Sequence, residues 1–314
     1  MCGIVGYLGK GTAQESLVDG LRRLEYRGYD SAGVAFHEGD EFSLSRETGR
    51  VENLANALRE SSSSSSLGIA HTRWATHGAV TVSNTHPHLS QDGKFVLVHN
   101  GVIENFGTLK RFLSSKGVSF SSETDSEVLC NLIAYHYSEL PEDEDRFIDA
   151  VRLALPKCRG AYGIAVLCLD YPEVMIGARR GSPLVVGLGD EANFIASDAS
   201  AFVGRAKEAV FLNDGEIAVL DKGEFRITTL EGQDAQAVTH PLDQILEEVE
   251  LGDFDSYMEK EIFEQPTALE NTLRGRFGDD GTTAKLGGLE GHEETLRDLD
   301  RIIFVACGTA RHAC

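Results

Sequence analysis

The 314-residue chain contains few cysteines, prolines and tryptophans, and it has no long apolar segment. None of its six cysteines form a Cys-x-x-Cys pair, and a disulfide framework is not expected in a chain of this length without a signal peptide. The N-terminus lacks a charged region followed by a long apolar one, and no apolar run approaches the length of a transmembrane helix. These absences predict a soluble cytoplasmic protein that does not contact membranes.

Positive charge is also scarce. The chain has 50 acidic and 29 basic residues, a formal net charge of −21, and most of the basic residues are arginine. Such a surface repels nucleic acids and anionic membranes, so neither is expected as a partner. A strongly acidic, lysine-poor surface also suits high salt, where self-repulsion is screened, so a halophilic source is a hypothesis. It predicts that folded structure is lost at low salt and recovered when salt is added.

The order of elements predicts an α+β fold with layered sheets. Helices are expected over residues 14–25, 51–59, 105–115, 126–138 and 143–155, among strands that become dense between 161 and 229. This arrangement fits a regular βαβ repeat poorly. We therefore predict a first domain over residues 2–238.

The character of the chain changes after residue 238. Residues 239–255 are rich in acids and predict a linker, and residues 256–314 begin a second domain. In that domain Arg301–Ala306 predicts a buried strand, followed by the loop Cys307-Gly308-Thr309-Ala310. Because a single strand cannot fold alone, we expect 256–314 to be the truncated start of an α/β domain.

Cys2 directly precedes a short apolar run that predicts a strand. If Met1 is removed, the thiol and a free α-amino group lie on one residue. An α-amino group has a pKa of about 7.7 to 8.0, so it can act as the base for the thiol near neutral pH. Position 2 alone is better explained as part of an unremarkable terminus, so the case for a catalytic thiol depends on other segments.

Three further segments carry groups that a lone thiol lacks. The first is HTRWATHG at 71–78, in which Arg73 has the planar fork that binds a carboxylate and Trp74 is the only tryptophan in the chain. A surface ion pair for Arg73 and a core anchor for Trp74 are the alternatives. Thr76 and His77 add short-range donors and acceptors.

The second and third segments are HNGVIEN at 99–105 and SETDSE at 122–127. Asn100 and Gly101 at a strand end offer a side-chain amide and a backbone N–H, the donors that an oxyanion hole needs, although Asn-Gly is also a common hairpin turn. Asp125 is placed either to meet the ammonium of an amino acid or to begin a helix in an N-cap motif. Together with Arg73 and Cys2, these residues describe a receptor for an α-amino acid with a nucleophile beside it.

With these segments, the chain resembles the glutaminase domain of the glutamine–fructose-6-phosphate aminotransferase family, also called glucosamine-6-phosphate synthase. Related amidotransferases that make phosphoribosylamine or asparagine share the N-terminal cysteine and Asn-Gly, but not HTRWATHG together with YRGYDSAG. The resemblance implies the four-layer αββα sandwich of the N-terminal-nucleophile hydrolases, followed by a truncated sugar-isomerase domain. It rests on these segments: CGIVG at 2–6, LRRLEYRGYDSAG at 21–33, HTRWATHG, HNGVIEN, YMEKEIFEQP at 257–266 and IIFVACGT at 302–309.

The resemblance also implies a role for each site residue. Cys2 would attack the side-chain amide of L-glutamine, its α-amino group would carry the proton, and Arg27 would lie beside that amine. Asn100 and Gly101 would stabilise the oxyanion. The glutamine backbone groups would be held by Arg73, Thr76, His77 and Asp125. Trp74 would act as the gate to the ammonia route.

In the complete enzyme the ammonia would convert fructose 6-phosphate to glucosamine 6-phosphate, in a homodimer and without a metal or organic cofactor. The family's sugar-phosphate loop is matched by Cys307, Gly308 and Thr309, but Ala310 replaces a serine that the family usually has there. The chain by itself is expected to show only glutaminase activity. Two alternatives remain, namely an amidotransferase for another acceptor and a non-catalytic glutamine-binding domain.

Overall fold

A computed structural model of the chain describes residues 2–74, 78–221, 224–242, 254–273, 276, 292–306 and 308–314. The chain divides into two units, Met1–Val249 and Glu250–Cys314. Within the first unit, the three residues Thr239–Pro241 form strand β14, which pairs with β11.

The first unit contains two antiparallel sheets. The eight-stranded sheet has the order β14-β11-β9-β10-β1-β4-β2-β3, and the six-stranded sheet has the order β13-β12-β8-β7-β6-β5. The remaining strands are β1 (Gly3–Gly9), β2 (Ser31–His37), β3 (Phe42–Thr48), β4 (Leu67–Arg73), β5 (His88–Leu89), β6 (Phe95–Ile103), β7 (Gly160–Cys168), β8 (Met175–Arg180), β9 (Val185–Leu188), β10 (Ala192–Ala196), β11 (Glu208–Phe211), β12 (Glu216–Asp221) and β13 (Glu224–Thr229).

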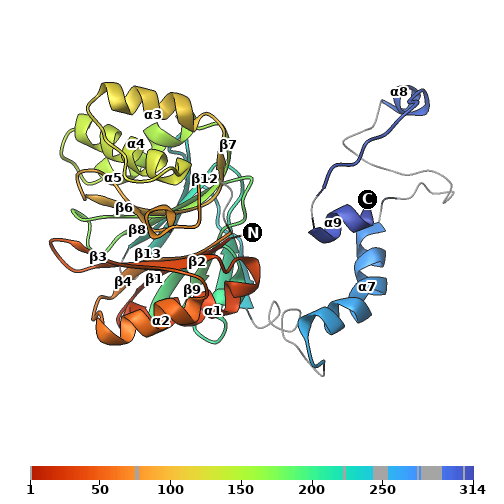
Figure 1. Cartoon of the computed structure of the whole chain (residues 1–314), viewed down its shortest axis with the longest axis horizontal. Helices are drawn as coiled ribbons and strands as arrows, with labels where there is room; N and C mark the ends of the chain where they lie inside the picture. Colours follow the sequence, from red (N-terminus) through yellow and green to blue (C-terminus); the bar gives the residue numbers. More distant parts are fainter. Residues whose placement is uncertain are drawn as a thin grey trace. The chain divides into compact units, whose positions relative to one another are not determined.

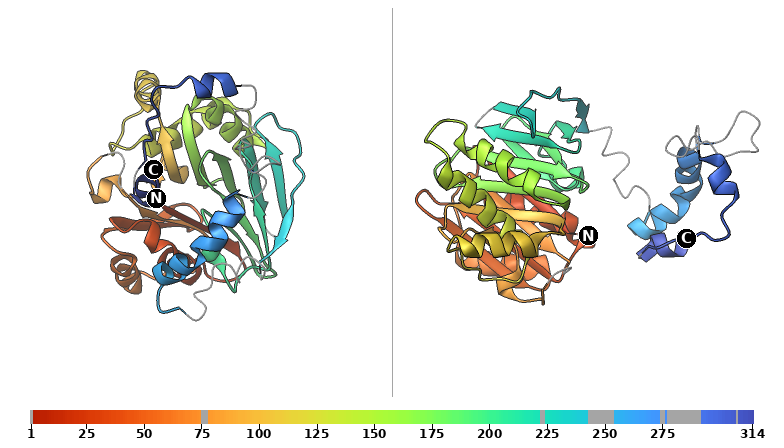
Figure 2. Two further views of the ribbon diagram at one scale, coloured as in Figure 1. Left: turned by 90° about the vertical axis from the view of Figure 1, so that its right-hand side faces the viewer. Right: turned by 90° about the horizontal axis from the view of Figure 1, so that it is seen from above.

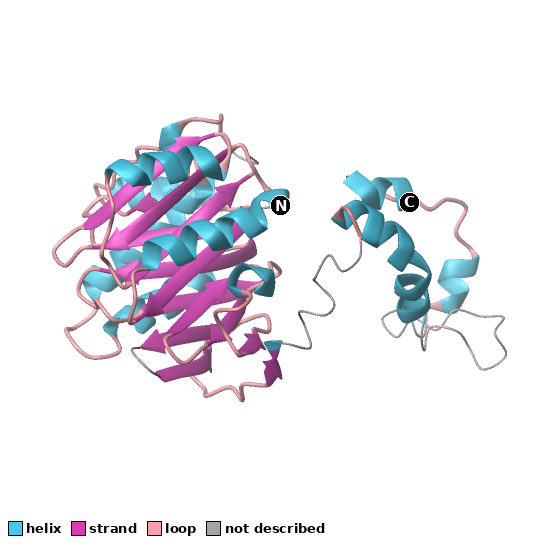
Figure 3. Ribbon diagram, turned by 90° about the horizontal axis from the view of Figure 1, so that it is seen from below, coloured by secondary structure: helices cyan, strands magenta, loops and turns pink. Residues whose placement is uncertain are grey.

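Helices cover the outer face of each sheet (Figure 1). Helices α3 (Phe106–Ser115), α4 (Asp125–Glu139) and α5 (Arg146–Ala154) lie across the six-stranded sheet (Figure 2, right). From the opposite side, α1 (Ala13–Leu24) and α2 (Val51–Glu60) cover the eight-stranded sheet (Figure 3). The predicted four-layer αββα sandwich is therefore confirmed.

Three apolar cores hold the layers together. One lies between the six-stranded sheet and α3–α5, one between the eight-stranded sheet and α1–α2, and one between the two sheets. The inner core joins Ile4 and Ile69 of one sheet to Val96 and Val98 of the other. Central strands such as β6 and β7 are thus buried on both faces, which explains their nearly continuous apolar sequences.

The described residues of the second unit form three helices: α7 (Tyr257–Leu273), α8 (Glu293–Arg297) and α9 (Gly308–Ala313). The strand predicted over residues 301–306 is wrong for this structure, which shows no strand there and leaves Ile303 and Val305 74% and 91% exposed. A strand forms only with a partner, and none is described beside this segment. Within the described part of the chain, no helix is long and apolar enough to span a membrane.

Candidate active site

Cys2 lies at the meeting point of β1 and β4. Strand β1 begins at Gly3, which pairs with Thr72, and the Gly3 N–H donates to Thr72 Oγ1 at 3.1 Å. The Trp74 N–H donates to Cys2 Sγ at 3.1 Å, and the thiol lies 3.5 Å from the Trp74 carbonyl oxygen. The Trp74 backbone, which directly follows β4, therefore contacts the Cys2 thiol through both its N–H and its carbonyl oxygen.

The loop before β2 braces this backbone. A side chain on Gly28 would place its Cβ 2.9 Å from the carbonyl carbon of Arg73 and 3.1 Å from the Trp74 nitrogen, so only glycine fits here. The Asp30 N–H donates to the Arg73 carbonyl at 3.1 Å. The motif YRGYDSAG thus packs directly against the peptide that binds the Cys2 sulfur.

Arg27 is tied to the segment after β10. Its guanidinium donates to the Ser197 carbonyl at 3.0 Å and to Ser197 Oγ at 3.2 Å, and it lies 3.8 Å from an Asp198 carboxylate oxygen. Ser197 Oγ also accepts the Ile4 N–H at 3.0 Å. Arg27 therefore acts on the start of β1 through Ser197, a residue that the sequence analysis did not single out.

Asn100 reaches Cys2 from the opposite sheet. Its Nδ2 donates to the Cys2 carbonyl at 3.0 Å, and its Oδ1 lies 3.0 Å from His71 Nε2. The predicted strand end is misplaced, because β6 runs through Asn100 and pairs with β7 as far as Ile103. The structure thus excludes a hairpin turn at Asn-Gly and brings the Asn100 amide next to Cys2.

Gly101 keeps its place in β6 through an unusual backbone conformation. Its φ is +129°, and a Cβ at this position would lie 2.1 Å from the Ala161 carbonyl oxygen. Both observations require glycine. The residue after Asn100 therefore approaches the neighbouring strand more closely than any side chain would allow.

Asp125 is the first residue of α4 and is almost fully buried. Its Oδ2 accepts the Ile103 N–H at 2.7 Å, while Oδ1 has a long contact of 3.5 Å with Ser126 Oγ. The N-cap itself is Thr124, whose Oγ1 accepts the Glu127 N–H. Asp125 therefore lies in an N-cap motif, and that motif fixes its carboxylate at the end of β6.

Arg73 and Trp74 differ in exposure although they are adjacent. Arg73 is 4% exposed and donates to the Ala79 carbonyl at 3.3 Å. Trp74 is 48% exposed and packs edge-to-face against Tyr29 at 5.5 Å between ring centroids. The structure thus excludes a surface ion pair for Arg73 and a core position for Trp74.

The environment of Cys2 favours the neutral thiol. Burial raises the pKa of the Cys2 thiol above its usual value, and this effect exceeds the opposing effects of the Trp74 N–H and Arg73. At neutral pH such a thiol could act as a nucleophile only if a base removed its proton. Removal of Met1 would place an α-amino group, which can serve as such a base, on the same residue.

Four buried histidines, His71, His86, His88 and His99, lie close to Asn100 and to one another. The rings of His71 and His86 stack at 4.1 Å, and His86 and His88 meet edge-to-face at 4.6 Å. Burial lowers the pKa of His71 to about 3 and holds those of His86 and His88 well below their usual range. The described residues include no group of three or more His, Cys, Asp or Glu placed to hold a metal ion.

The fourth histidine, His99, links this cluster to α4. Its N–H donates to His86 Nδ1 at 3.2 Å, and its Nδ1 lies 2.9 Å from Ser126 Oγ. His71 and His99 stand inside the quoted motifs, yet sequence reasoning assigned neither of them a role. Both histidines stand at the ends of apolar segments that predict buried strands, which could have marked them as buried. One sequence, however, does not show which strands contact each other.

Some predicted site residues lie outside the described part of the chain, namely Thr76, His77 and Cys307. Gly308 and Thr309 belong to α9. The loop proposed for a sugar phosphate is therefore only partly described, and its three residues remain a prediction.

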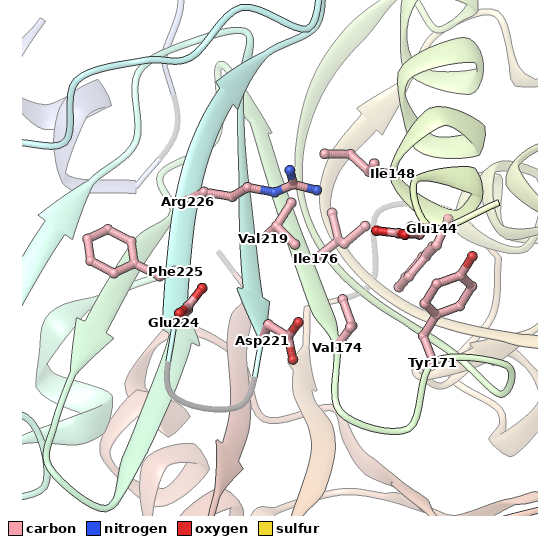
Figure 4. Close-up of a pocket in the computed structure, with 11 residues that line it drawn as sticks. Glu144, Ile148, Tyr171, Val174, Ile176, Val219, Asp221, Glu224, Phe225 and Arg226 are labelled. Atoms are coloured by element: carbon pink, nitrogen blue, oxygen red, sulfur yellow. The ribbon is translucent and has the colours of Figure 1, made fainter.

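A pocket of about 550 Å³ lies away from these residues, between the helix-facing side of the six-stranded sheet and α5 (Figure 4). Phe147, Ile176 and Val219 form its apolar floor, and carboxylates such as Glu144 and Glu224 stand at its rim. None of the predicted site residues lines it. We assign it no function.

Comparisons with known proteins place the site in context. Residues 55–139 match the family described as glutamine amidotransferase domain. A glutamine–fructose-6-phosphate aminotransferase (isomerizing) from Thermus thermophilus is 45% identical over 314 residues, covering 100% of this chain and 50% of that protein. The enzyme of the same name from Bacteroides thetaiotaomicron is 44% identical over 315 residues and is covered to 51%.

A solved structure supports the fold assignment. The glutamine phosphoribosylpyrophosphate amidotransferase from B. subtilis, complexed with ADP and GMP, superimposes with a TM-score of 0.63 at 25% identity, covering 73% of this chain and 49% of that one. The chain therefore has the fold of the N-terminal-nucleophile hydrolase amidotransferases, and residues 55–139 match a glutamine amidotransferase domain. Over its whole length the chain is a homologue of the glutamine–fructose-6-phosphate aminotransferases, and it spans about half the length of these curated relatives.

Proposed function

We propose that the chain is the glutaminase half of a glutamine–fructose-6-phosphate aminotransferase and that Cys2 is its nucleophile. The observation that carries this proposal is the convergence on Cys2 of the Trp74 N–H, at 3.1 Å from the sulfur, and the Asn100 amide, at 3.0 Å from the carbonyl. One donor directly follows β4 of the eight-stranded sheet, and the other lies in β6 of the six-stranded sheet. They meet at the second residue of the chain, where a free α-amino group forms when Met1 is removed.

The reaction has two balanced steps. In the first, the Cys2 sulfur bonds to the side-chain carbonyl carbon of L-glutamine, the C–N bond breaks, and the thiol proton passes through the α-amino group to the departing nitrogen. Ammonia leaves and a γ-glutamyl thioester remains. In the second step, water attacks the thioester carbon, glutamate is released and the thiol regains a proton. Asn100 and Gly101 stabilise the oxyanion in both steps.

The substrate's α-amino and α-carboxylate groups need partners of opposite charge. Asp125 suits the ammonium, because it is buried and its Oδ1 has only a 3.5 Å contact with Ser126. Arg73 suits the carboxylate through its planar fork, with Thr76 and His77 as further partners. Trp74 would gate the route by which ammonia leaves. Its half-exposed side chain and the contact of its backbone N–H with the thiol support this role.

In the complete protein, ammonia would reach fructose 6-phosphate and yield glucosamine 6-phosphate. The proposal assigns residues 256–314 to the start of the sugar-isomerase domain and 239–255 to the linker, with Cys307, Gly308 and Thr309 in the sugar-phosphate loop. The exposed apolar side chains of this segment, such as Ile303 and Val305, support a surface that packs against another part of a protein. The homodimer and the cytoplasmic location remain predictions.

Ammonia and glutamate release from L-glutamine tests the proposal, with Cys2→Ala and wild type assayed side by side. We expect wild type to release both products in equal amounts and Cys2→Ala to release neither. An undiminished rate in Cys2→Ala would reject the nucleophile. Binding of glutamine without turnover by wild type with a free Cys2 amine would instead favour a glutamine-binding domain.

The acceptor requires a separate experiment on the full-length protein. Fructose 6-phosphate, glutamine and enzyme should yield glucosamine 6-phosphate. If glutamine is hydrolysed but no amino sugar forms, the amidotransferase serves another acceptor. This outcome would leave the assignment of Cys2 intact.

A further inference from the structure

We propose that His71 is a positioning residue for the oxyanion hole, and that its Nε2–H holds the Asn100 amide with its nitrogen directed towards the reacting carbon at Cys2. The proposal rests on the glutaminase function above. His71 lies in the eight-stranded sheet, whereas Asn100 lies in the six-stranded sheet. No described hydrogen bond joins His71 to the proposed substrate-binding residues Arg73 and Asp125.

The direction of the hydrogen bonds follows from the acceptor at one end. The Cys2 carbonyl can only accept, so the group 3.0 Å from it must be the amide nitrogen of Asn100. The amide oxygen of Asn100 then faces His71 Nε2 at 3.0 Å. Because that oxygen can only accept, Nε2 must carry a hydrogen, which fixes the His71 tautomer.

This chain of bonds leaves one donor for catalysis. An asparagine side-chain nitrogen has two hydrogens, and the Cys2 carbonyl takes one of them. The second hydrogen can meet an oxyanion formed on the substrate carbon that bonds to Cys2 Sγ. If the amide rotated by 180°, its oxygen would face both the Cys2 carbonyl and the oxyanion, and stabilisation would become repulsion.

His71 is suited to prevent this rotation because it is itself fixed. It is 1% exposed on β4, and its ring stacks on that of His86 at 4.1 Å with 14° between the planes. His86 in turn is held through Nδ1, which accepts the His99 N–H at 3.2 Å. His99 directly precedes Asn100 in β6. The strand that carries the Asn100 amide therefore also holds His86, the ring on which His71 stacks.

The low pKa of His71, about 3, agrees with this role. A neutral ring donates one hydrogen to the Asn100 amide oxygen without adding a buried positive charge there. The donor is therefore present at every pH at which the thiol can react.

The test compares three substitutions at one site. His71→Leu removes the donor, and we expect kcat for glutamine hydrolysis to fall by about 10- to 100-fold with KM changed less than about threefold, since loss of a complete oxyanion donor lowers kcat by roughly 10²–10³. His71→Gln places an amide N–H near the position of Nε2 and should recover most of kcat. His71→Asn, whose amide is too short to reach Asn100, should not.

Buried His37 provides a matched control. It is 7% exposed on β2, and its Nε2 lies 3.1 Å from the Leu169 carbonyl of the opposite side of the sandwich. His37→Leu therefore removes a comparable buried histidine bond far from Cys2. We expect it to lower stability while kcat stays at the wild-type value. An equal loss of kcat in both leucine variants would show that His71 acts only through general stability.

A double-mutant cycle with Asn100 gives the decisive result. If His71 acts through Asn100, then adding His71→Leu to Asn100→Ala should lower kcat no further. Additive effects of the two substitutions would overturn the proposal.

Alkylation by iodoacetamide separates the oxyanion hole from the thiol, because displacement of iodide forms no oxyanion. The rate at Cys2, followed by mass spectrometry of the N-terminal peptide, should be the same in wild type and His71→Leu. A parallel loss of alkylation and turnover would place the effect on the thiol and contradict the proposal.

Failure of the proposed function would give a different result. In that case wild type releases no ammonia, or Cys2→Ala retains the wild-type rate. An unchanged kcat in His71→Leu, with active wild type and inactive Cys2→Ala, rejects only the role of His71.

Discussion

The buried, neutral His71 predicts that the first unit loses stability in mild acid. Its pKa is about 3 in the folded protein and 6.5 in the unfolded chain. Between these pH values the unfolded chain binds the extra proton, so the stabilisation is complete above about pH 6.5 and falls as pH approaches 3. At pH 5 the loss spans about 1.5 pH units at roughly 1.4 kcal/mol each, or about 2 kcal/mol from this histidine alone.

In wild type, His86 and His88 add to this loss, because their pKa values are shifted in the same direction. The net charge of −21 acts the other way, since protonation of surface carboxylates reduces their repulsion. Comparison of wild type with His71→Gln cancels both contributions. Urea unfolding followed by far-ultraviolet circular dichroism, in about 0.5 M salt to screen the surface charges, gives the free energy of unfolding at pH 7.5 and pH 5.

We expect wild type to lose about 2 kcal/mol more than His71→Gln between these two pH values. Val34→Ala provides the control, because Val34 is fully buried but does not titrate, and its effect should be the same at both pH values. Equal losses in wild type and His71→Gln would refute the inference that His71 is buried in its neutral form.

Three substitutions test other contacts in and around the site. Gly101→Ala forces a Cβ to within 2.1 Å of the Ala161 carbonyl oxygen at a φ of +129°, so we expect a loss of at least about 3 kcal/mol in urea unfolding, and wild-type stability would contradict the backbone geometry. Gly28→Ala presses on the Arg73 carbonyl carbon and should displace the Trp74 N–H from the Cys2 sulfur, lowering glutaminase kcat by about tenfold or more, and an unchanged kcat would show that this N–H is dispensable. Glu127→Gln should cost about 3 kcal/mol in unfolding free energy, because the carboxylate accepts four hydrogen bonds from two serines and an amide replaces half of its acceptors with donors, whereas a loss below about 0.5 kcal/mol would refute that network.

The layered fold could be predicted because its signals are local. The 3–4 residue spacing of Leu17, Leu21 and Leu24 predicts α1, and all three side chains are buried in the core beneath the eight-stranded sheet. The prediction of a strand over residues 301–306 failed, because a strand forms only when other strands lie beside it. Residues 301–306 have the composition of a buried strand, yet no neighbour is described for them to pair with.

The candidate site was predictable as a set of residue types but not as a set of contacts. Cys2, Asn100 and Gly101 were identified from the chemistry that they offer, and the structure brings Asn100 to Cys2 across the two sheets. The supporting residues were missed, because Ser197 reaches Ile4 over 193 positions of sequence and His71 reaches Asn100 over 29. Only the sheet topology makes such pairs neighbours.

The central claim is that Cys2 reacts as the first residue of the chain, with its own α-amino group as base. The most direct measurement uses the protein carrying an N-terminal extension that a protease removes to leave Cys2 first. Ammonia release from L-glutamine is measured before and after cleavage, with Cys2→Ala treated identically. We expect no turnover with the extension attached, full turnover after its removal and none in Cys2→Ala at either stage. Equal turnover before and after cleavage would contradict the role of the α-amino group, and turnover by Cys2→Ala would contradict the nucleophile itself.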